Sequence, residues 1–236
     1  MKCRSTIMAA ALLALSLCLP ADPANAEDGA SADVLADRML AALGGREAWA
    51  GLRNTVNGSR QNRAGVPTVV YTEITMDFEN PRFRIESTGP DIHVVRVING
   101  VDSWRQRLSG SIEDVPDELF EDEIRWYGAH LYRTIHRVAA RDSSITVGLG
   151  SEGRLQVFEN SERIMWFRLD ADGEPYAFGT YDDDVGSLLG PWTFEESGIR
   201  HPAWVSNPDG TWRAAVRSLS VNVPLQDFMF ARPAGH

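Results

Sequence analysis

Side chains able to bind a metal ion or transfer a proton are few in this chain, and the five histidines are the first to consider. His130 and His136 are six residues apart in a predicted helix, so they point to different faces and cannot share one metal ion. His93 falls in a predicted strand, where a half-solvated position accounts for it without chemistry. The histidine spacing therefore predicts no metal site.

The densest acidic cluster is the run Asp182-Asp183-Asp184, the best candidate in the sequence for calcium ligands. Calcium loops place alternating oxygen ligands around a glycine turn, and three consecutive carboxylates do not reproduce that spacing. A solvated acidic loop is the interpretation we favour. We accordingly predict neither a bound metal nor any other cofactor.

Hydrolase chemistry has little support in the sequence. Ser103 and Ser109 lack the G-x-S-x-G setting of a nucleophile elbow. Carboxylates are numerous, and a pair suited to glycoside hydrolysis stays open because its separation in space cannot be read from a sequence. We predict that the protein is not an enzyme and has no catalytic residues, with a carboxylate-based hydrolase as the least favoured alternative.

The N-terminal residues have the pattern of a secretory signal peptide. Lys2 and Arg4 give a positive start, an apolar run covers residues 7–19, and Ala24-Asn25-Ala26 is a small-x-small cleavage site. The pattern predicts that residues 1–26 are removed on secretion. We therefore expect a periplasmic protein.

The composition of the mature chain limits what it can bind. Both cysteines, Cys3 and Cys18, lie in the predicted signal peptide, so the mature chain has no disulfide, and lipidation of Cys18 is left open. The chain has a net charge of −10, and Lys2 is its single lysine. This balance argues against nucleic-acid binding and against electrostatic docking on anionic lipid. Residues 27–236 suffice for a single domain with a sizeable core.

Two helical regions are predicted. Residues 31–43 have apolar side chains at helical spacing, with Ser31 as the cap and Gly44-Gly45 as the stop. A longer helix is predicted over residues 116–141, with acids in its first turns and arginines near its end. Its apolar side chains recur every three or four residues and form one stripe, made of Phe120, Ile124, Tyr127, Leu131, Ile135 and Val138.

Alternating apolar and polar residues predict about ten or eleven strands joined by short turns. Pro81 separates two of these strands, and Asn99-Gly100 is typical of a hairpin turn. This order of elements predicts an antiparallel α+β domain with helices on one face of the sheet. The apolar stripe of the long helix is either plain core, the commoner case, or the wall of an apolar pocket.

Several short motifs, in their order and spacing, resemble the periplasmic lipoprotein-carrier superfamily of LolA/LolB-like proteins. The resemblance spans nearly the whole mature chain and rests on residues 40–54, 81–84, 93–98, 99–104 and 221–233. It implies one half-barrel domain over residues 27–236, a strongly curved, incomplete antiparallel β-barrel with helices packed on its concave face. The family's carrier has an arginine before the corner proline, where this chain has Asn80, so transfer of cargo stays open.

The same resemblance implies a function. It implies a periplasmic binding or carrier protein for a lipid, the acyl chains of a lipoprotein or another apolar ligand. The residues that we predict to line the apolar cavity are Phe83, Trp104, Phe120, Ile124, Tyr127, Leu131 and Ile135. The alternative is a structural or interaction module of the cell envelope with the same fold and a filled core. We expect no membrane-spanning segment in the mature chain and favour a monomer.

Overall fold

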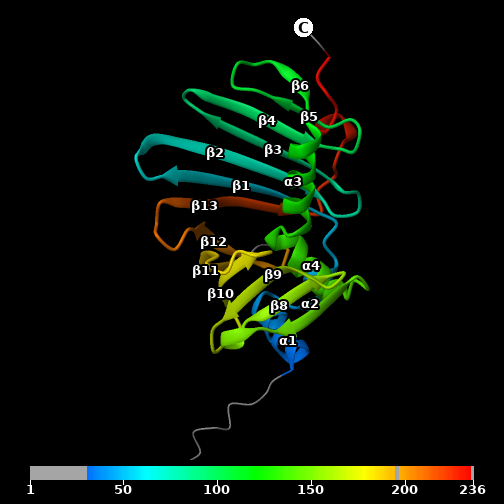
Figure 1. Cartoon of the computed structure of the whole chain (residues 1–236), viewed down its shortest axis with the longest axis vertical. Coiled ribbons are helices and arrows are strands. Elements are labelled where there is room, and N and C mark those ends of the chain that lie inside the picture. Colours follow the sequence, from blue (N-terminus) through cyan, green and yellow to red (C-terminus); the bar gives the residue numbers. More distant parts are fainter. Residues whose placement is uncertain (1–30, 195–196, 235–236) are drawn as a thin grey trace, which may run out of the picture.

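Thirteen strands form one curved antiparallel sheet that is not closed into a barrel, in a computed structural model that describes residues 31–194 and 197–234 (Figure 1). This confirms the predicted α+β fold, whereas the predicted signal peptide lies outside the described residues. The strands are β1 (Asn54–Arg63), β2 (Val66–Asp77), β3 (Arg82–Gly89), β4 (Ile92–Ile98), β5 (Trp104–Gln106), β6 (Ile112–Asp114), β7 (Ile145–Leu149), β8 (Leu155–Glu159), β9 (Glu162–Leu169), β10 (Pro175–Thr180), β11 (Ser187–Phe194), β12 (Arg200–Ser206) and β13 (Trp212–Val221).

The sheet has more strands than predicted because β1, β6 and β11 lack a clear alternating pattern. β1 consists largely of Asn, Gly, Ser, Gln and Arg, and β6 has only three residues. β11 contains Gly190-Pro191, a pair that usually marks a turn. Tertiary pairing overrides these weak propensities, because β1 is hydrogen bonded along its length to β2 on one side and β13 on the other.

The strand order explains why helices cross the sheet. The order is β6-β5-β4-β3-β2-β1-β13-β12-β11-β10-β9-β8-β7, which is two meanders that meet where β1 pairs with β13. β6 is therefore one edge of the sheet and β7 is the other, although they are joined by the next segment of the chain. That segment contains α3 (Asp117–Gly128) and α4 (Leu131–Ala140), which must run across the concave face from edge to edge (Figure 1).

The single helix predicted over residues 116–141 is wrong at Ala129 and His130, where the chain breaks between α3 and α4. His130 has an extended backbone, with φ −66° and ψ 136°. It lies two residues after Gly128, a residue type of low helix propensity. The break lets Tyr127 on α3 pack against the inner face of β2 to β4, while Ile135 on α4 packs into the main core. The apolar stripe is thus divided between two clusters.

The main core lies under the N-terminal helices, α1 (Ala32–Ala42) and α2 (Arg46–Ala50). The predicted helix over residues 31–43 is confirmed as α1, and Ser31 Oγ accepts a hydrogen bond from Val34 N. Trp49 on α2 is fully buried and donates its Nε1–H to Leu43 O at 2.8 Å. These helices, α4 and the apolar faces of β8, β9 and β11 form the largest apolar cluster.

A separate cluster lies on the other face of β4 and β5, where the C-terminal segment packs. Its fully or almost fully buried members are Val95, Val97, Trp104 and Phe230. Trp104 donates its Nε1–H to Phe230 O at 3.0 Å. The Arg82 guanidinium lies 4.3 Å from the centroid of the Phe230 ring. These contacts fix the chain after the short helix η3 (Asp227–Met229) against the outer face of the sheet.

Candidate functional site

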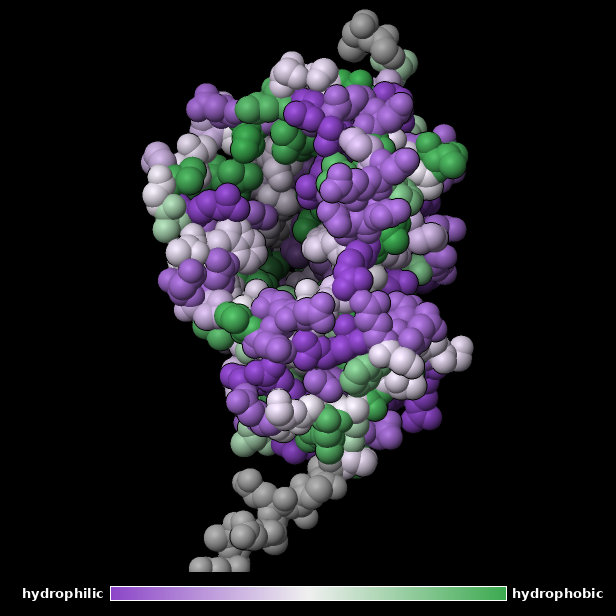
Figure 2. All heavy atoms as spheres, viewed as in Figure 1, coloured by the Kyte–Doolittle hydropathy of each residue, from purple (hydrophilic) through white to green (hydrophobic). Residues whose placement is uncertain are grey.

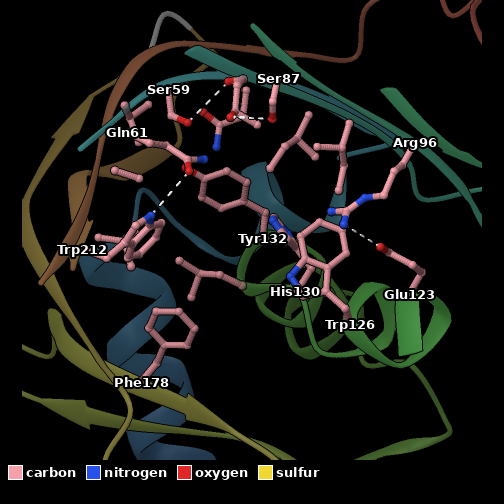
Figure 3. A pocket seen from close by; sticks show the side chains of 18 of the residues that line it. Ser59, Gln61, Ser87, Arg96, Glu123, Trp126, His130, Tyr132, Phe178 and Trp212 are labelled. Carbon is pink, nitrogen blue, oxygen red and sulfur yellow. Dashed lines mark hydrogen bonds and ion pairs between the residues drawn. The ribbon is translucent and has the colours of Figure 1, made fainter. Parts of the chain in front are cut away.

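A cavity of about 550 Å³ lies between the concave face of the sheet and the α3–α4 segment. Figure 2 shows the molecule hollowed beside α3, and Figure 3 shows the side chains that line the cavity. The strands contribute Asn57, Ser59, Gln61, Thr72, Ile74, Ile85, Ser87, Arg96, Phe178, Val205, Trp212, Ala214 and Val216. The helical segment contributes Asp122, Glu123, Trp126, His130, Leu131 and Tyr132.

Uncharged polar side chains on β1, β2 and β3 form one wall of the cavity, which we call the polar floor: Asn57, Ser59, Gln61, Thr72 and Ser87. Ser59, Thr72 and Ser87 are direct cross-strand partners, so their side chains stand in a row on one face. The Oγ atoms of Thr72 and Ser87 share a hydrogen bond of 2.9 Å. Ser59 Oγ donates to Thr72 O at 3.4 Å (Figure 3). The row makes this part of the concave face polar.

Aromatic side chains stand across the cavity from the polar floor (Figure 3). The Trp126 and Tyr132 rings meet His130 edge to face, with centroids 5.0 and 5.5 Å from the imidazole. Burial, helped by the positive charge of Arg133, lowers the pKa of His130 from 6.5 to about 3. The imidazole is therefore neutral at neutral pH. Its Nδ1 is buried and has no hydrogen-bond partner among the described residues.

An ion pair joins α3 to the sheet beside the cavity. Arg96 Nη1 on β4 and Glu123 Oε1 on α3 are 3.0 Å apart (Figure 3). Burial raises the pKa of the Glu123 carboxyl, the Arg96 charge opposes the rise, and Asp122 adds to it. The charged residues of the lining are these two and Asp122, so charge is confined to the side of the cavity nearest α3 and β4.

The residues predicted to line a cavity are spread over four places in the structure. Leu131 lines the cavity. Phe83 and Tyr127 pack beside it with their rings stacked 5.6 Å apart, in a cluster that also includes Phe120 and Ile124. Ile135 lies in the main core, and none of its surface is exposed.

Trp104, the remaining predicted residue, lies on the opposite face of the sheet. Trp104 pairs with Val97, and successive residues of a strand point to opposite faces. Because Arg96 points into the cavity, Val97 and Trp104 point away from it, toward Phe230. Trp104 is therefore part of the outer cluster and not of the cavity lining.

The sequence does not predict the polar floor. Three of its residues lie on β1, which has no alternating apolar pattern and is not among the predicted strands. Asn57, Ser59 and Gln61 nevertheless occur at every second position of β1, which is the period of one strand face. A search for alternating uncharged polar residues is the signal that would have found them. The sequence also does not predict that Trp126 and His130 face the floor. Their position depends on the break between α3 and α4.

The acidic run at residues 182–184 takes part in turn and ion-pair contacts. Asp183 Oδ1 accepts hydrogen bonds from Val185 N and Gly186 N at 3.0 and 2.9 Å. Asp184 Oδ1 lies 3.0 Å from Arg163 Nη2, within ion-pair distance. Within residues 31–194 and 197–234, no three His, Cys, Asp or Glu side chains are placed to hold one metal ion. Over the same ranges, no helix has the length and apolar character needed to span a membrane.

The fold is similar to that of a DUF1329 family protein from Desulfovibrio piger. The two chains are 12% identical, the match covers 84% of this chain and 95% of the other, and the TM-score is 0.50. At 12% identity the likeness shows the fold alone. The fold agrees with the resemblance to LolA/LolB-like proteins.

Two further solved structures are weaker matches, each with a TM-score of 0.33. One is an uncharacterized conserved protein from Thermus thermophilus, 12% identical, with 80% of this chain and 90% of the other covered. The other is from the Pseudomonas aeruginosa MucA/MucB complex, 16% identical, with 85% of this chain and 61% of the other covered. No protein-family model and no curated protein matches the sequence.

Proposed function

We propose that the protein is a periplasmic binding or carrier protein that holds an apolar or amphipathic ligand in the cavity under α3 and α4. The observation that carries the proposal is the cavity of about 550 Å³ between these helices and the concave sheet. Its volume lies within the range of about 300–1,000 Å³ that is typical of small-molecule sites. Apolar and aromatic side chains make up about half of its lining and polar side chains the rest, so the site can receive both an apolar body and a polar group.

The packing around the cavity supports a ligand-binding role over a filled core. On one side of Leu131, the main cluster buries Trp49 and Ile135 completely. In the neighbouring cluster, Met76 and Phe83 are completely buried as well. The apolar cores are therefore complete beside the cavity, and the cavity is an additional space. An apolar ligand that enters it removes surface from water, which contributes about 25 cal/mol per Å² before the costs of association.

Secretion is part of the proposal. Residues 1–26 have the features of a signal peptide, and cleavage after Ala26 leaves Glu27 as the first residue. N-terminal sequencing of the protein from a periplasmic fraction should read from Glu27. A chain that starts at Cys18 and carries lipid would contradict a freely diffusing carrier.

Native mass spectrometry of protein purified from its own cell envelope tests the function. The expected result is a bound amphiphile that is lost on denaturation. The stripped protein should then bind 1-aminoanthracene, an uncharged fluorescent probe, and release it when oleyl lipids are added. If no ligand co-purifies and the probe does not bind, the interaction module of the cell envelope becomes the better account.

A further inference from the structure

Two side chains of the polar floor, Asn57 and Ser59, offer hydrogen-bond acceptors to a ligand. Asn57 Oδ1 is buried and has no donor among the described residues. Ser59 Oγ uses its proton on Thr72 O, so its remaining capacity is to accept. A buried acceptor without a donor raises the free energy of the unliganded protein. A ligand that brings a donor to this place therefore gains affinity.

The charges around the cavity disfavour an ionised head group on the floor. The floor itself carries no charged side chain. Arg96 is already paired with Glu123, at 3.0 Å, and the His130 imidazole opposite the floor is neutral. A carboxylate or phosphate placed on the floor would be desolvated without a counter-charge, and it would leave the unpaired Asn57 Oδ1 without a donor. An ammonium group would find acceptors there, but no side chain of the floor would compensate its charge.

The rest of the lining suits an apolar tail. The walls beside the floor are apolar or aromatic, formed by Ile74, Ile85, Leu131, Phe178, Val205 and Val216. Purely apolar cargo would fill these walls but would cover the polar floor without pairing it, and burying unpaired polar groups is unfavourable. Both parts of the lining are satisfied together only by a molecule with a polar end and an apolar body.

We infer that the ligand is a neutral amphiphile whose hydroxyl or amide head group lies on the polar floor and donates toward Asn57 and Ser59. This inference rests on the proposed function, because it assigns the ligand class of the same cavity. The head group thus lies against the sheet, and the tail lies along the apolar walls.

A panel of lipids with the same tail tests the head group. Stripped wild-type protein is loaded with 1-aminoanthracene, and monoolein, oleyl alcohol, oleate and oleylamine are titrated at neutral pH, below the concentrations at which they form micelles or vesicles. The two hydroxyl lipids should displace the probe at concentrations about tenfold or more below those of the charged lipids, since unpaired burial of a charge outweighs one hydrogen bond.

Asn57→Leu locates the head group, and Asn62→Leu is its control, because Asn62 lies on the same strand, is exposed and does not line the cavity. Asn57→Leu should lower the affinity for monoolein about two- to tenfold, which is the range of one hydrogen bond. The affinity for 1-aminoanthracene should stay unchanged. Ser59→Ala is the second variant, and it should weaken monoolein in the same direction.

The outcomes separate this inference from the proposed function. If oleate or oleylamine displaces the probe at the same concentration as monoolein, the inference of a neutral head group is wrong. The proposal that the cavity binds a ligand is then unaffected. If Asn57→Leu and Ser59→Ala both fold and keep full monoolein affinity, the head group does not lie on the floor and the inference is overturned. If wild type binds neither the probe nor any of the lipids, the proposed function fails together with this inference.

Discussion

Arg96 on β4 and Glu123 on α3 form an ion pair in which only one partner is buried. Their Nη1 and Oε1 atoms are 3.0 Å apart, but the side chain of Glu123 is 8% exposed and that of Arg96 is 42% exposed. Removing the carboxylate from water offsets much of its attraction to a guanidinium that stays partly solvated. The pair therefore positions α3 over the sheet and contributes little to stability.

Glu123→Gln should leave the free energy of unfolding unchanged at neutral pH, or raise it by up to about 1 kcal/mol. The pKa of Glu123 is raised by burial, so folded wild type binds this proton more tightly than the unfolded chain and is stabilised as the pH falls through the raised value. The difference between variant and wild type should thus shrink in mild acid. Urea denaturation at both pH values measures it.

The control for this prediction is Glu121→Gln, at an exposed position of the same helix. It should change the free energy of unfolding neither at neutral pH nor in mild acid. A loss of more than about 1 kcal/mol in Glu123→Gln at neutral pH would show that the ion pair is a net source of stability.

Leu131→Trp should block the cavity without unfolding the protein. Leu131 lies where the main core meets the cavity, so an indole can extend into open space. We expect the free energy of unfolding to stay within about 1 kcal/mol of wild type, whereas overpacking a closed core costs about 1–3 kcal/mol. Affinity for 1-aminoanthracene, measured by fluorescence titration, should fall because its space is filled.

Ile135→Trp is the matched control, one helical turn along α4 and fully buried away from the cavity lining. Its free energy of unfolding should fall by about 1–3 kcal/mol, which is what overpacking a closed core costs. Equal destabilisation of the two variants, with probe binding retained in Leu131→Trp, would argue that the cavity is not the binding site.

Phe230→Ala should destabilise the protein by about 3 kcal/mol or more, because it removes a fully buried ring from the outer cluster. Phe228, two residues earlier, is 75% exposed, and Phe228→Ala should have no measurable effect on stability. Thermal unfolding compares the two. Probe affinity of folded Phe230→Ala should match wild type, since this cluster and the cavity lie on opposite faces of the sheet; a large loss of affinity would contradict that separation.

The ion pairs of Arg137 make stability sensitive to acid. The Arg137 side chain is 7% exposed and bonds Asp142 at 2.7 Å and Glu159 at 2.5 Å. Burial alone would raise the pKa of Asp142, but hydrogen bonds from Arg137 and Ser144 outweigh it and lower the pKa from 3.8 to about 2. The hydrogen bond from Arg137 also lowers the pKa of Glu159, against the effect of burial.

Because the pKa of Asp142 is lower in the folded than in the unfolded chain, its contribution is complete above the unfolded value and is lost as the pH falls from about 4 to about 2. Asp142→Asn should therefore cost about 1–2 kcal/mol at neutral pH and make unfolding less dependent on pH in that window. Urea denaturation across the window measures both effects. Asp172→Asn, at an exposed turn, should keep the wild-type profile.

The sequence predicts the fold class well because most strands bury one face and expose the other. It fails at β1, whose polar residues are held in the sheet by partners on both sides, β2 and β13. It also fails at Ala129 and His130, where an unbroken apolar period hides a helix break. In both cases the deciding interactions come from distant parts of the chain, and local propensity does not contain them.

The candidate site is harder to predict than the fold. An apolar stripe shows that Leu131 and Ile135 are turned inward, but it cannot show that the first reaches a cavity and the second a closed core. Trp104 illustrates the same limit, since the face of its strand follows from its pairing with Val97. The polar floor is set by the cross-strand register of β1, β2 and β3, which only the assembled sheet defines.

The pairing of β1 with β13 also determines how the cavity is assembled. Gln61 and Trp212, joined by an Nε1–Oε1 hydrogen bond of 3.4 Å, line the cavity from two strands at nearly opposite ends of the described chain. Contacts of such sequence separation form slowly in folding, because a long loop must close first. A β1 strand that is not yet paired with β13 exposes an edge that other chains can pair with, so aggregation competes with folding at this point. The cavity lining is complete only when the two meanders have joined, because neither meander contains it alone.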